Sequence, residues 1–151
     1  MSVLGPQAVV HQAGEGEANH AFLTRRFRLM PEDTGGTFAL WEEEIPEGVR
    51  PPLHVHHDAQ ELFVVLEGRV RFRCSGRETE AGPGASVLIP QHAEHTFKGL
   101  GPGTSRVLVQ LVPGRGVGFF REAEGLDPET EMDRILEIAR KYELEIVGPP
   151  I

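Results

Sequence analysis

The sequence predicts one all-β domain, a barrel or sandwich, that is followed by a single α-helix. A chain of 151 residues has the usual length of one domain and can bury a full core. Short runs of strand-like composition recur along it, and glycine or proline interrupts them roughly every ten residues, which is typical of barrels and sandwiches. Near the C-terminus the hydrophobic period changes to that of a helix.

The N-terminal part of the chain leads into the first strands. Residues 1–20 are rich in small and polar residues, so we expect a loose arm or an edge strand there. Residues 21–29 alternate between two faces, as a strand does, and residues 31–36 carry turn residues. Residues 37–45 return as a second strand, which the prolines and the glycine of residues 46–52 end.

The centre of the chain has the clearest strand pattern. In residues 69–74 apolar side chains alternate with three arginines, which predicts a half-buried strand with a solvated arginine face rather than an anion site. Glu67 and Gly68 before it are predicted to form a hairpin turn, since glycine adopts a positive φ without steric cost. The remaining strands are predicted at residues 53–57, 61–66, 77–81, 85–89, 95–97 and 106–112.

The C-terminal helix is predicted from its start signal and its apolar stripe. Asp127 suits the N-cap and Pro128 the first helical position. The stripe packs on the barrel or caps its mouth, and consists of Met132, Ile135, Leu136, Ala139 and Tyr142. We therefore divide the chain into an arm (1–20), a barrel (21–125) and a helix with a tail (126–151).

Composition and charge exclude several classes of protein. The formal net charge of −8 argues against binding to nucleic acid or to an anionic membrane surface. The apolar run from Leu62 to Leu66 is too short to span a bilayer, and residues 1–10 lack the basic region of a signal peptide. Cys74 is the one cysteine, so no disulfide can form within the chain, which fits a cytoplasmic location.

Four ligand-type side chains lie at informative positions in the predicted strands. His54 and His56 are two apart, which places both rings on one face of a strand. Glu61 begins the next strand and His95 a later one, so both can reach the same cavity. Three imidazoles and one carboxylate suit a divalent transition metal better than magnesium or calcium. The alternative is a polar barrel interior in which these groups bond one another.

The other histidines and the cysteine are weaker candidates for metal ligands. His57 follows His56 and should face the opposite way, so we do not count it as a ligand. His92 lies in the turn before His95, either on the surface or as a partner of the site. Cys74 is interpreted as a small buried hydrophobe. The candidates for an apolar pocket wall, for which core packing is an equal explanation, are Phe63, Val65, Val70, Phe72 and Phe97.

The two histidine-containing segments resemble the paired motifs of the cupin superfamily. The first motif, G-x5-H-x-H-x4-E-x6-G, matches at every defined position, from Gly48 to Gly68. The second, G-x5-P-x-G-x2-H-x3-N, matches at Gly84, Pro90 and His95. The sequence departs from it at His92, where the family has glycine, and at Gly99, where it has asparagine. A looser likeness, to small quercetin-dioxygenase-like cupins, comes from a single domain with a C-terminal helix.

The resemblance implies a jelly-roll barrel, a double-stranded β-helix, that holds one divalent transition metal per chain (iron, manganese, nickel, copper or zinc). The implied ligands are His54, His56, Glu61 and His95, and Glu61, as the anionic ligand, is a candidate base. The implied function is a dioxygenase-like oxidoreductase acting on a small phenolic or enolisable substrate. The alternatives are a metal-dependent isomerase or lyase and a non-catalytic binding module. We expect a homodimer, because exposed barrel edges are commonly covered by pairing.

Overall fold

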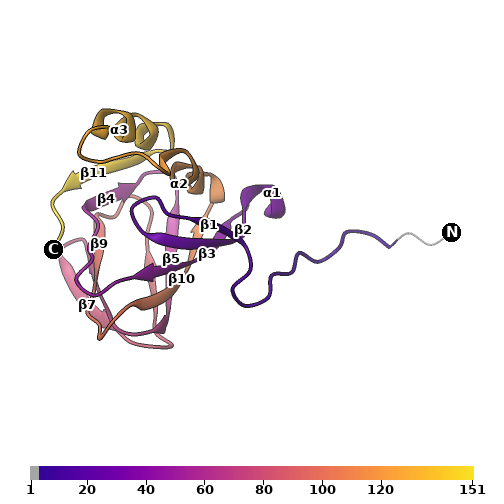
Figure 1. The fold of residues 1–151 in the computed structure, drawn as a ribbon, viewed down its shortest axis with the longest axis horizontal. Helices are drawn as coiled ribbons and strands as arrows, with labels where there is room; N and C mark the ends of the chain where they lie inside the picture. The colour runs from indigo at the N-terminus through magenta and orange to yellow at the C-terminus, as the bar shows by residue number, and fades with distance from the viewer. Residues whose placement is uncertain (1–3) are drawn as a thin grey trace.

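Two antiparallel sheets face each other in the computed structural model, which describes residues 4–151 (Figure 1). The larger sheet has the strand order β1 (Glu17–Asn19), β2 (Thr24–Leu29), β3 (Ala39–Ile45), β10 (Ser105–Val112), β5 (Gln60–Glu67) and β8 (Ser86–Ile89). The smaller sheet has the order β11 (Leu144–Gly148), β4 (Leu53–His56), β9 (His95–Gly99), β6 (Val70–Cys74) and β7 (Arg77–Ala81). This confirms the predicted all-β class.

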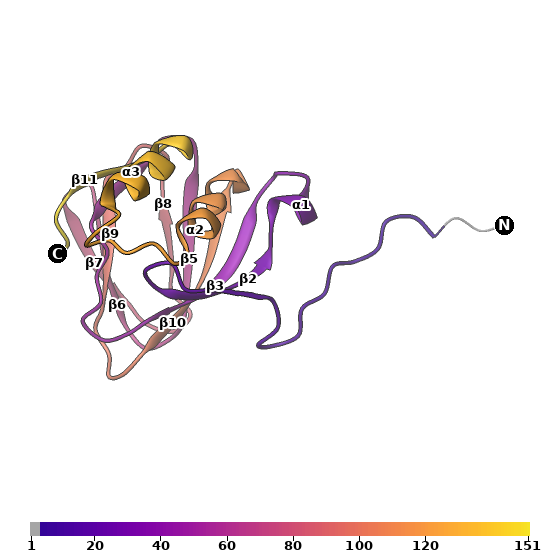
Figure 2. The same cartoon turned by 45° about the horizontal axis from the view of Figure 1, so that its top comes forward.

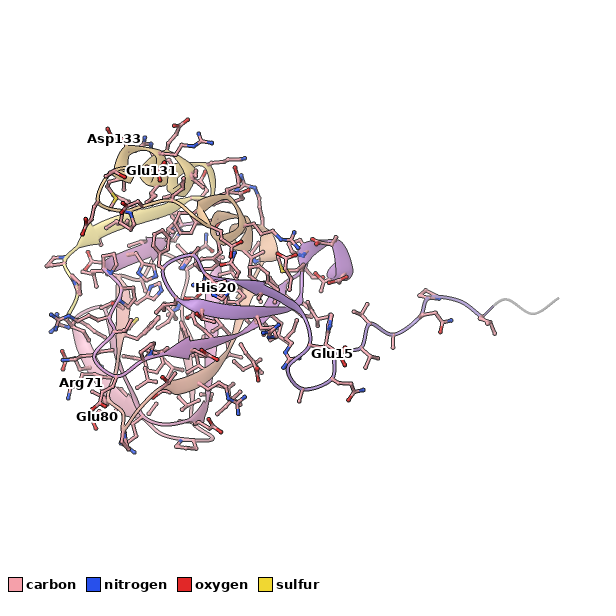
Figure 3. All side chains as sticks on the ribbon, viewed as in Figure 1. Glu15, His20, Arg71, Glu80, Glu131 and Asp133 are labelled. Atoms are coloured by element: carbon pink, nitrogen blue, oxygen red, sulfur yellow. The ribbon has the colours of Figure 1, made fainter. Side chains whose placement is uncertain are left out.

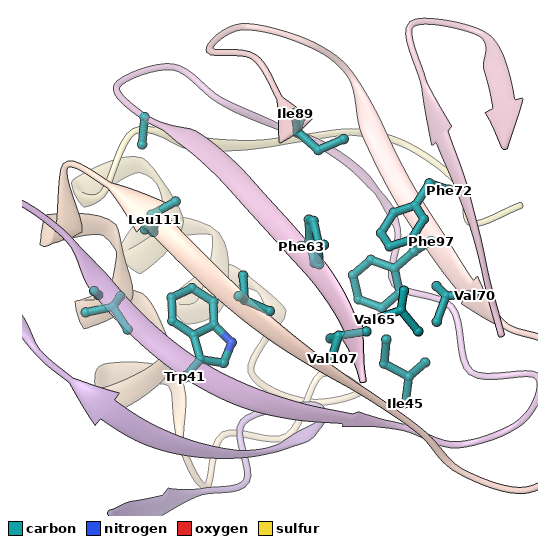
Figure 4. Close-up of a cluster of buried hydrophobic side chains, with 14 of the residues drawn as sticks. Trp41, Ile45, Phe63, Val65, Val70, Phe72, Ile89, Phe97, Val107 and Leu111 are labelled. Atoms are coloured by element: carbon teal, nitrogen blue, oxygen red, sulfur yellow. The ribbon is translucent and has the colours of Figure 1, made fainter. Parts of the chain in front are cut away.

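The core fills the space between the two sheets. Strands β3, β5 and β10 bury every second side chain, as expected for sheets with one face on a core. Phe63 of one sheet packs against Phe72 and Phe97 of the other, with ring centroids 5.1 and 5.7 Å apart (Figure 4). Each such buried aromatic ring contributes a large apolar area, so these contacts hold the sheets together.

The chain passes from one sheet to the other at Gly68. Strand β5 pairs with β8 and β10, whereas β6 pairs with β7 and β9. The predicted hairpin at Glu67 and Gly68 is therefore wrong, although the need for glycine is real. Gly68 has φ of 78°, and a Cβ there would lie 2.2 Å from the hydroxyl oxygen of Ser105. Alternating patterns predict strands but not the strand each one pairs with.

The arginine face of β6 is paired with the neighbouring strand β7. Arg71 donates to Glu80 at 3.0 Å, and both side chains lie on the outside of the barrel (Figure 3). Arg73 donates to Glu78 at 2.8 Å. These cross-strand pairs are exposed, so each contributes little to stability. The arginines thus form the solvated face that the alternation predicts.

Helices gather at one end of the barrel. Helix α3 (Met132–Lys141) lies beside α2 (Gly118–Ala123) and strand β11 (Figures 1 and 2). A 3-10 turn, η1 (Gly114–Val117), leads into α2, and a short helix, α1 (Pro31–Thr34), replaces the predicted turn after β2. The sequence analysis did not foresee η1, α2 or β11. None of the helices within residues 4–151 is long and apolar enough to cross a membrane.

Helix α3 begins later than its start signal predicts. Asp127 accepts a hydrogen bond from the backbone N–H of Glu129 at 2.9 Å, so it organises a turn. The helix begins only at Met132, with Glu131 as its N-cap, and the prediction of Asp127 as N-cap is wrong. Its buried face consists of Ile135, Ile138 and Ala139.

Both ends of the chain contribute strands to the sheets. Strand β1 lies in the predicted arm and pairs with β2, and β11 lies in the predicted tail and pairs with β4. The division into arm, barrel and tail at residues 20 and 125 stays a prediction.

Candidate metal centre

Strand β4 places two histidines beside a third from β9. His54 and His56 project from the same face of β4, and their ring centroids are 5.3 Å apart. His95 is the first residue of β9 and pairs directly with His54 across the sheet. The ring centroids of His54 and His95 are consequently only 4.2 Å apart. The register of a single bridge thus brings the three imidazoles together.

Glu61 reaches the same place from the opposite sheet. Its Oε1 lies 3.2 Å from Nε2 of His95 and 3.6 Å from Nε2 of His56. One ligand atom from each of the four predicted residues lies within 4.8 Å of the others. Ligand atoms about 2.1 Å from a shared ion would lie roughly 3–4 Å from one another. The donor set therefore fits a first-row divalent ion in chemistry, and its spread of up to 4.8 Å is close to the spacing that such an ion requires.

Backbone carbonyls hold two of the rings in the orientation that a metal needs. Nδ1 of His54 lies 2.8 Å from the carbonyl oxygen of Pro52, and Nδ1 of His95 lies 3.0 Å from that of Ala93. A carbonyl can only accept, so Nδ1 carries the proton in the neutral His54 ring and Nε2 keeps its lone pair, whereas Nε2 of His95 also lies 3.2 Å from Oε1 of Glu61. Metal-ligating histidines commonly make this second hydrogen bond, which fixes their tautomer.

Burial and mutual charge set the ionisation of the cluster. Burial, and to a smaller extent the neighbouring His95 and His56, lower the pKa of His54 to about 3. Burial also lowers the pKa of His56, although Glu61 opposes this. Burial raises the pKa of Glu61, but the surrounding imidazoles outweigh it and hold this pKa at about 2. At neutral pH the site thus offers neutral His54 and an anionic carboxylate, the forms that bind metal.

The cluster opens on a pocket of about 320 Å³. His54, His56 and Glu61 line it, while His95 is only 1% exposed. Most of the wall is apolar, and Phe63 and Phe97 belong to it as the sequence suggested. Val65, Val70 and Phe72 lie in the core instead. A concave apolar pocket with a few convergent polar groups is the usual form of a small-molecule site.

The sequence analysis missed a buried ion pair in the pocket wall. Arg25 of β2 and Glu43 of β3 are 3% and 4% exposed, and their side chains meet at 2.8 Å. Glu43 lies between two other glutamates, so composition alone marks the segment as surface. Strand alternation with the buried Trp41 and Ile45 was the signal that could have placed Glu43 inside.

Comparison with known proteins agrees with this geometry. The sequence profile of the cupin domain matches residues 41–111, which hold all four side chains of the cluster. The fold is shared with the cupin domain of Cnp3 from Schizosaccharomyces pombe, at a TM-score of 0.62 and 16% identity, over 81% of this chain and 85% of that one. The chain is a member of the cupin superfamily. Its two-sheet barrel with a C-terminal helix is the cupin jelly roll that the motifs implied.

Two other relatives of this cupin are more similar in sequence. It is 28% identical to quercetin 2,3-dioxygenase of Bacillus subtilis (strain 168) over 158 aligned residues, which cover 96% of this chain and 46% of the relative. It is 27% identical to the polyketide cyclase RemF from Streptomyces resistomycificus, at a TM-score of 0.59, over 71% of this chain and 80% of that one. The cupin spans about half the length of the curated relatives it matches.

The structure accounts for both departures from the cupin motifs. His92 has φ of 72°, in the left-handed region that the family's glycine adopts without strain. At the asparagine position, a Cβ on Gly99 would lie 2.6 Å from the carbonyl oxygen of Pro46, so this cupin packs a loop there. Neither departure alters the four side chains of the cluster.

The remaining candidate residues lie outside the cluster. The side chain of His57 meets Glu145 of β11 at 2.7 Å, and its Nδ1 is 3.2 Å from Nδ1 of His92. His92 also donates its backbone N–H to the carbonyl of His56 at 3.0 Å, which ties the turn to β4. Cys74 is a half-buried free thiol that packs on the core.

Proposed function

We propose that His54, His56, Glu61 and His95 hold one divalent transition metal per chain. The supporting observation is their convergence, with four ligand atoms within 4.8 Å of one another and two rings fixed by carbonyls. Nitrogen and oxygen donors of this kind suit iron, manganese, nickel, copper and zinc alike, so the donor set leaves the choice to metal supply. A metal bound here would act as a Lewis acid or as a redox centre for dioxygen chemistry.

We further propose a dioxygenase-like oxidoreductase that acts on a small phenolic or enolisable molecule. The cluster lies in the wall of an apolar pocket, and the similarity to a quercetin 2,3-dioxygenase extends over 96% of the chain. The aromatic walls would bind a planar substrate and exclude water from the reacting atoms. The site's lowered imidazole pKa values keep nitrogen lone pairs available at neutral pH.

Glu61 has two candidate roles in this proposal. As the anionic member of the cluster, it would balance the charge of a divalent ion. Its pKa of about 2 favours the ionised form, so it is a better ligand than proton acceptor while the imidazoles surround it. A role as base would therefore require Glu61 to leave the cluster when substrate binds.

A redox-neutral reaction is the second candidate. The 27% identity to a polyketide cyclase favours it, because the same residues and the same pocket can serve Lewis-acid chemistry such as isomerisation or elimination. A binding module without turnover is the third alternative that the residues allow.

Metal analysis combined with oxygen uptake tests these alternatives. The protein is purified without a tag or chelators, its metal is measured by mass spectrometry, and oxygen consumption is followed with quercetin and smaller phenols. We expect a stoichiometric first-row metal and substrate-dependent uptake. Uptake without metal would contradict the proposal, as would failure to bind any candidate ion on reconstitution. Conversion without oxygen use would select the redox-neutral reaction, and saturable binding without conversion the binding module.

The matched variants are His56→Ala, which removes a proposed ligand, and His57→Ala, which removes the adjacent ring outside the cluster. Metal and uptake should be lost in the first and kept in the second.

We also propose a homodimer in the cytoplasm. The supporting features are exposed apolar side chains on the N-terminal arm, at Leu4, Val9 and Val10, and the free thiol of Cys74. Light scattering of the intact chain, beside a variant with these three residues changed to serine, would test the dimer. Cell fractionation would test the location.

A further inference from the structure

The pocket contains a second polar group of side chains, separate from the histidine cluster. Trp41 and Glu43 are two apart on β3, so both project inward from the same face of the larger sheet. Both side chains line the pocket and both are almost completely buried, at 1% and 4% exposure. Arg25 pairs with Glu43 from the adjacent strand. A polar group within an apolar wall requires either a structural or a ligand-binding explanation.

The indole N–H of Trp41 has no partner in the protein. Within residues 4–151, only three buried side-chain nitrogen or oxygen atoms lack a hydrogen bond, and the other two belong to Asp58 and Arg73, which do not line the pocket. A buried donor without a partner is costly, so it is expected to meet water or a ligand. Because Trp41 lines the pocket, a ligand acceptor that packs against this part of the wall would satisfy the donor.

One carboxylate oxygen of Glu43 accepts no hydrogen bond from Arg25. Arg25 donates from Nε and from Nη2, at 3.0 and 2.8 Å, and both bonds end on Oε1. Oε2 therefore receives neither bond and remains an acceptor. Burial raises the pKa of Glu43, and Arg25 and the nearby Trp41 oppose this rise. The indole N–H thus lies near the carboxylate, but it does not form a hydrogen bond with it.

Arg25 makes the geometry of this group rigid. Its Nη1 donates to the side chain of Asn19 at 2.8 Å and to the backbone carbonyl of Ala21 at 2.9 Å. The guanidinium carbon also lies 3.7 Å from the ring centroid of Phe120. These contacts hold Arg25 from several sides, and Arg25 in turn fixes Oε1 of Glu43. Such preorganisation reduces the entropy lost when a ligand binds.

We propose that Trp41 and Glu43 form a hydroxyl-recognition subsite. A ligand hydroxyl can accept from the indole N–H and donate to Oε2, so one group satisfies both. The ligand class is an aromatic molecule with a metal-binding oxygen at one end and a separate hydroxyl that reaches β3. This deepens the proposed function and rests on it for the metal-binding end only. Water can bridge the same two groups, so the test must compare ligands that differ by one hydroxyl.

Binding of matched probes to the zinc-loaded protein tests the subsite without requiring turnover. The probes are 3-hydroxyflavone, its derivatives with one further hydroxyl at each ring position, and the corresponding methyl ethers. Trp41 is the one tryptophan of the sequence, so quenching of its emission reports on occupation of the pocket. Titration calorimetry supplies the dissociation constants for variants that lack it.

We expect one derivative with an added hydroxyl to bind the unchanged protein roughly 10-fold or more tightly than 3-hydroxyflavone, as one well-formed hydrogen bond provides. The methyl ether of this compound cannot donate a hydrogen bond to Glu43, so its affinity should fall back to that of 3-hydroxyflavone. In Glu43→Gln and Trp41→Phe the ratio of the affinities for the hydroxylated derivative and for 3-hydroxyflavone should fall at least severalfold. Glu44→Gln, a charge-matched change at an exposed position of the same strand, should keep the full gain.

Three results would overturn the subsite: no probe binds, no added hydroxyl improves binding, or the gain persists in both variants. Trp41→Phe removes no hydrogen bond of the folded protein, so it remains informative if Glu43→Gln fails to fold. The outcome is independent of oxygen chemistry. A selective subsite without oxygen uptake would refute the dioxygenase proposal alone, and uptake without hydroxyl selectivity would refute the subsite alone.

Discussion

His95 lies directly opposite His54 in the one residue pair that joins β9 to β4, with the ring centroids 4.2 Å apart. This bridge links two motifs that are far apart in the sequence, so the cluster forms only when the smaller sheet is assembled. Metal binding and pairing of these strands should therefore support each other.

Removal of one proposed ligand should lower metal content while leaving the barrel folded. His54→Ala and His95→Ala each delete one of the four converging side chains. We expect affinity to fall by more than the roughly 10–100-fold that losing a mere orienting partner costs. Elemental analysis after dialysis measures the content, and circular dichroism checks the fold. A variant that keeps a full complement of metal would show that the assigned ligand is wrong.

The adjacent His57 provides the matched control for this experiment. It pairs with Glu145 on the outside of the cluster, so His57→Ala should leave the metal content unchanged. Loss of metal in this variant would mean that His57 supports the site from outside it.

The metal-free protein should lose stability as the pH falls below about 6.5. The pKa of His54 is about 3 in the folded protein against 6.5 as a free side chain, so between these values the unfolded chain binds the extra proton. Protons then favour unfolding, and each such proton lowers the unfolding free energy by up to about 1.4 kcal/mol per pH unit. Glu61 acts in the same direction below pH 4.5, because its folded pKa is about 2.

Thermal unfolding of the metal-free protein from pH 8 to pH 5 measures this effect. The melting temperature should decline over this range and decline less in His54→Gln, which cannot take up the proton. Identical profiles for the two proteins would exclude His54 as the source.

Gly68→Ala should destabilise the crossing between the sheets by about 2 kcal/mol or more, as expected when a left-handed φ and a backbone clash combine. A Cβ at this position would lie 2.2 Å from Ser105 Oγ and 2.9 Å from Ser105 Cα. Gly76→Ala is the matched control, because its φ of 80° is similar to the 78° of Gly68, but its Cβ would meet nothing within 4 Å. Urea titration should show a smaller loss of unfolding free energy for Gly76→Ala than for Gly68→Ala. Equal losses would mean that the strained φ, and not the contact with Ser105, causes the whole effect.

Much of the fold could be predicted from local pattern alone. Strand alternation located β6 and β7, and the spacing of His54, His56, Glu61 and His95 identified the side chains that converge. Residues with period two or with a fixed motif spacing are determined locally, so a single sequence shows them.

The features that were missed depend on contacts between distant segments. Strand β11 exists because β4 has a free edge, and its own sequence carries only a weak alternation. Strand alternation directs Glu43 inward, but a carboxylate is accommodated there because Arg25 from another strand pairs with it. At β11 and Glu43, tertiary partners override local preference. Asp127 differs, because its missing cap has a local cause: its backbone N–H donates to the side chain of Glu131 at 2.7 Å, which helps to hold the segment as a turn.

His92→Gly should have a higher unfolding free energy than His92→Ala, by about 1 kcal/mol. At most positions alanine is the more stabilising of these two residues, so the order is reversed here. Both changes remove the contact of the ring with His57, so this loss cancels in the comparison. The difference that remains is the φ of 72°, which glycine adopts freely and alanine does not. Urea titration of both variants measures it, and both should keep their metal, since His92 lies outside the cluster. If alanine were the more stable of the two, the turn before His95 would have to adopt an ordinary backbone conformation in solution.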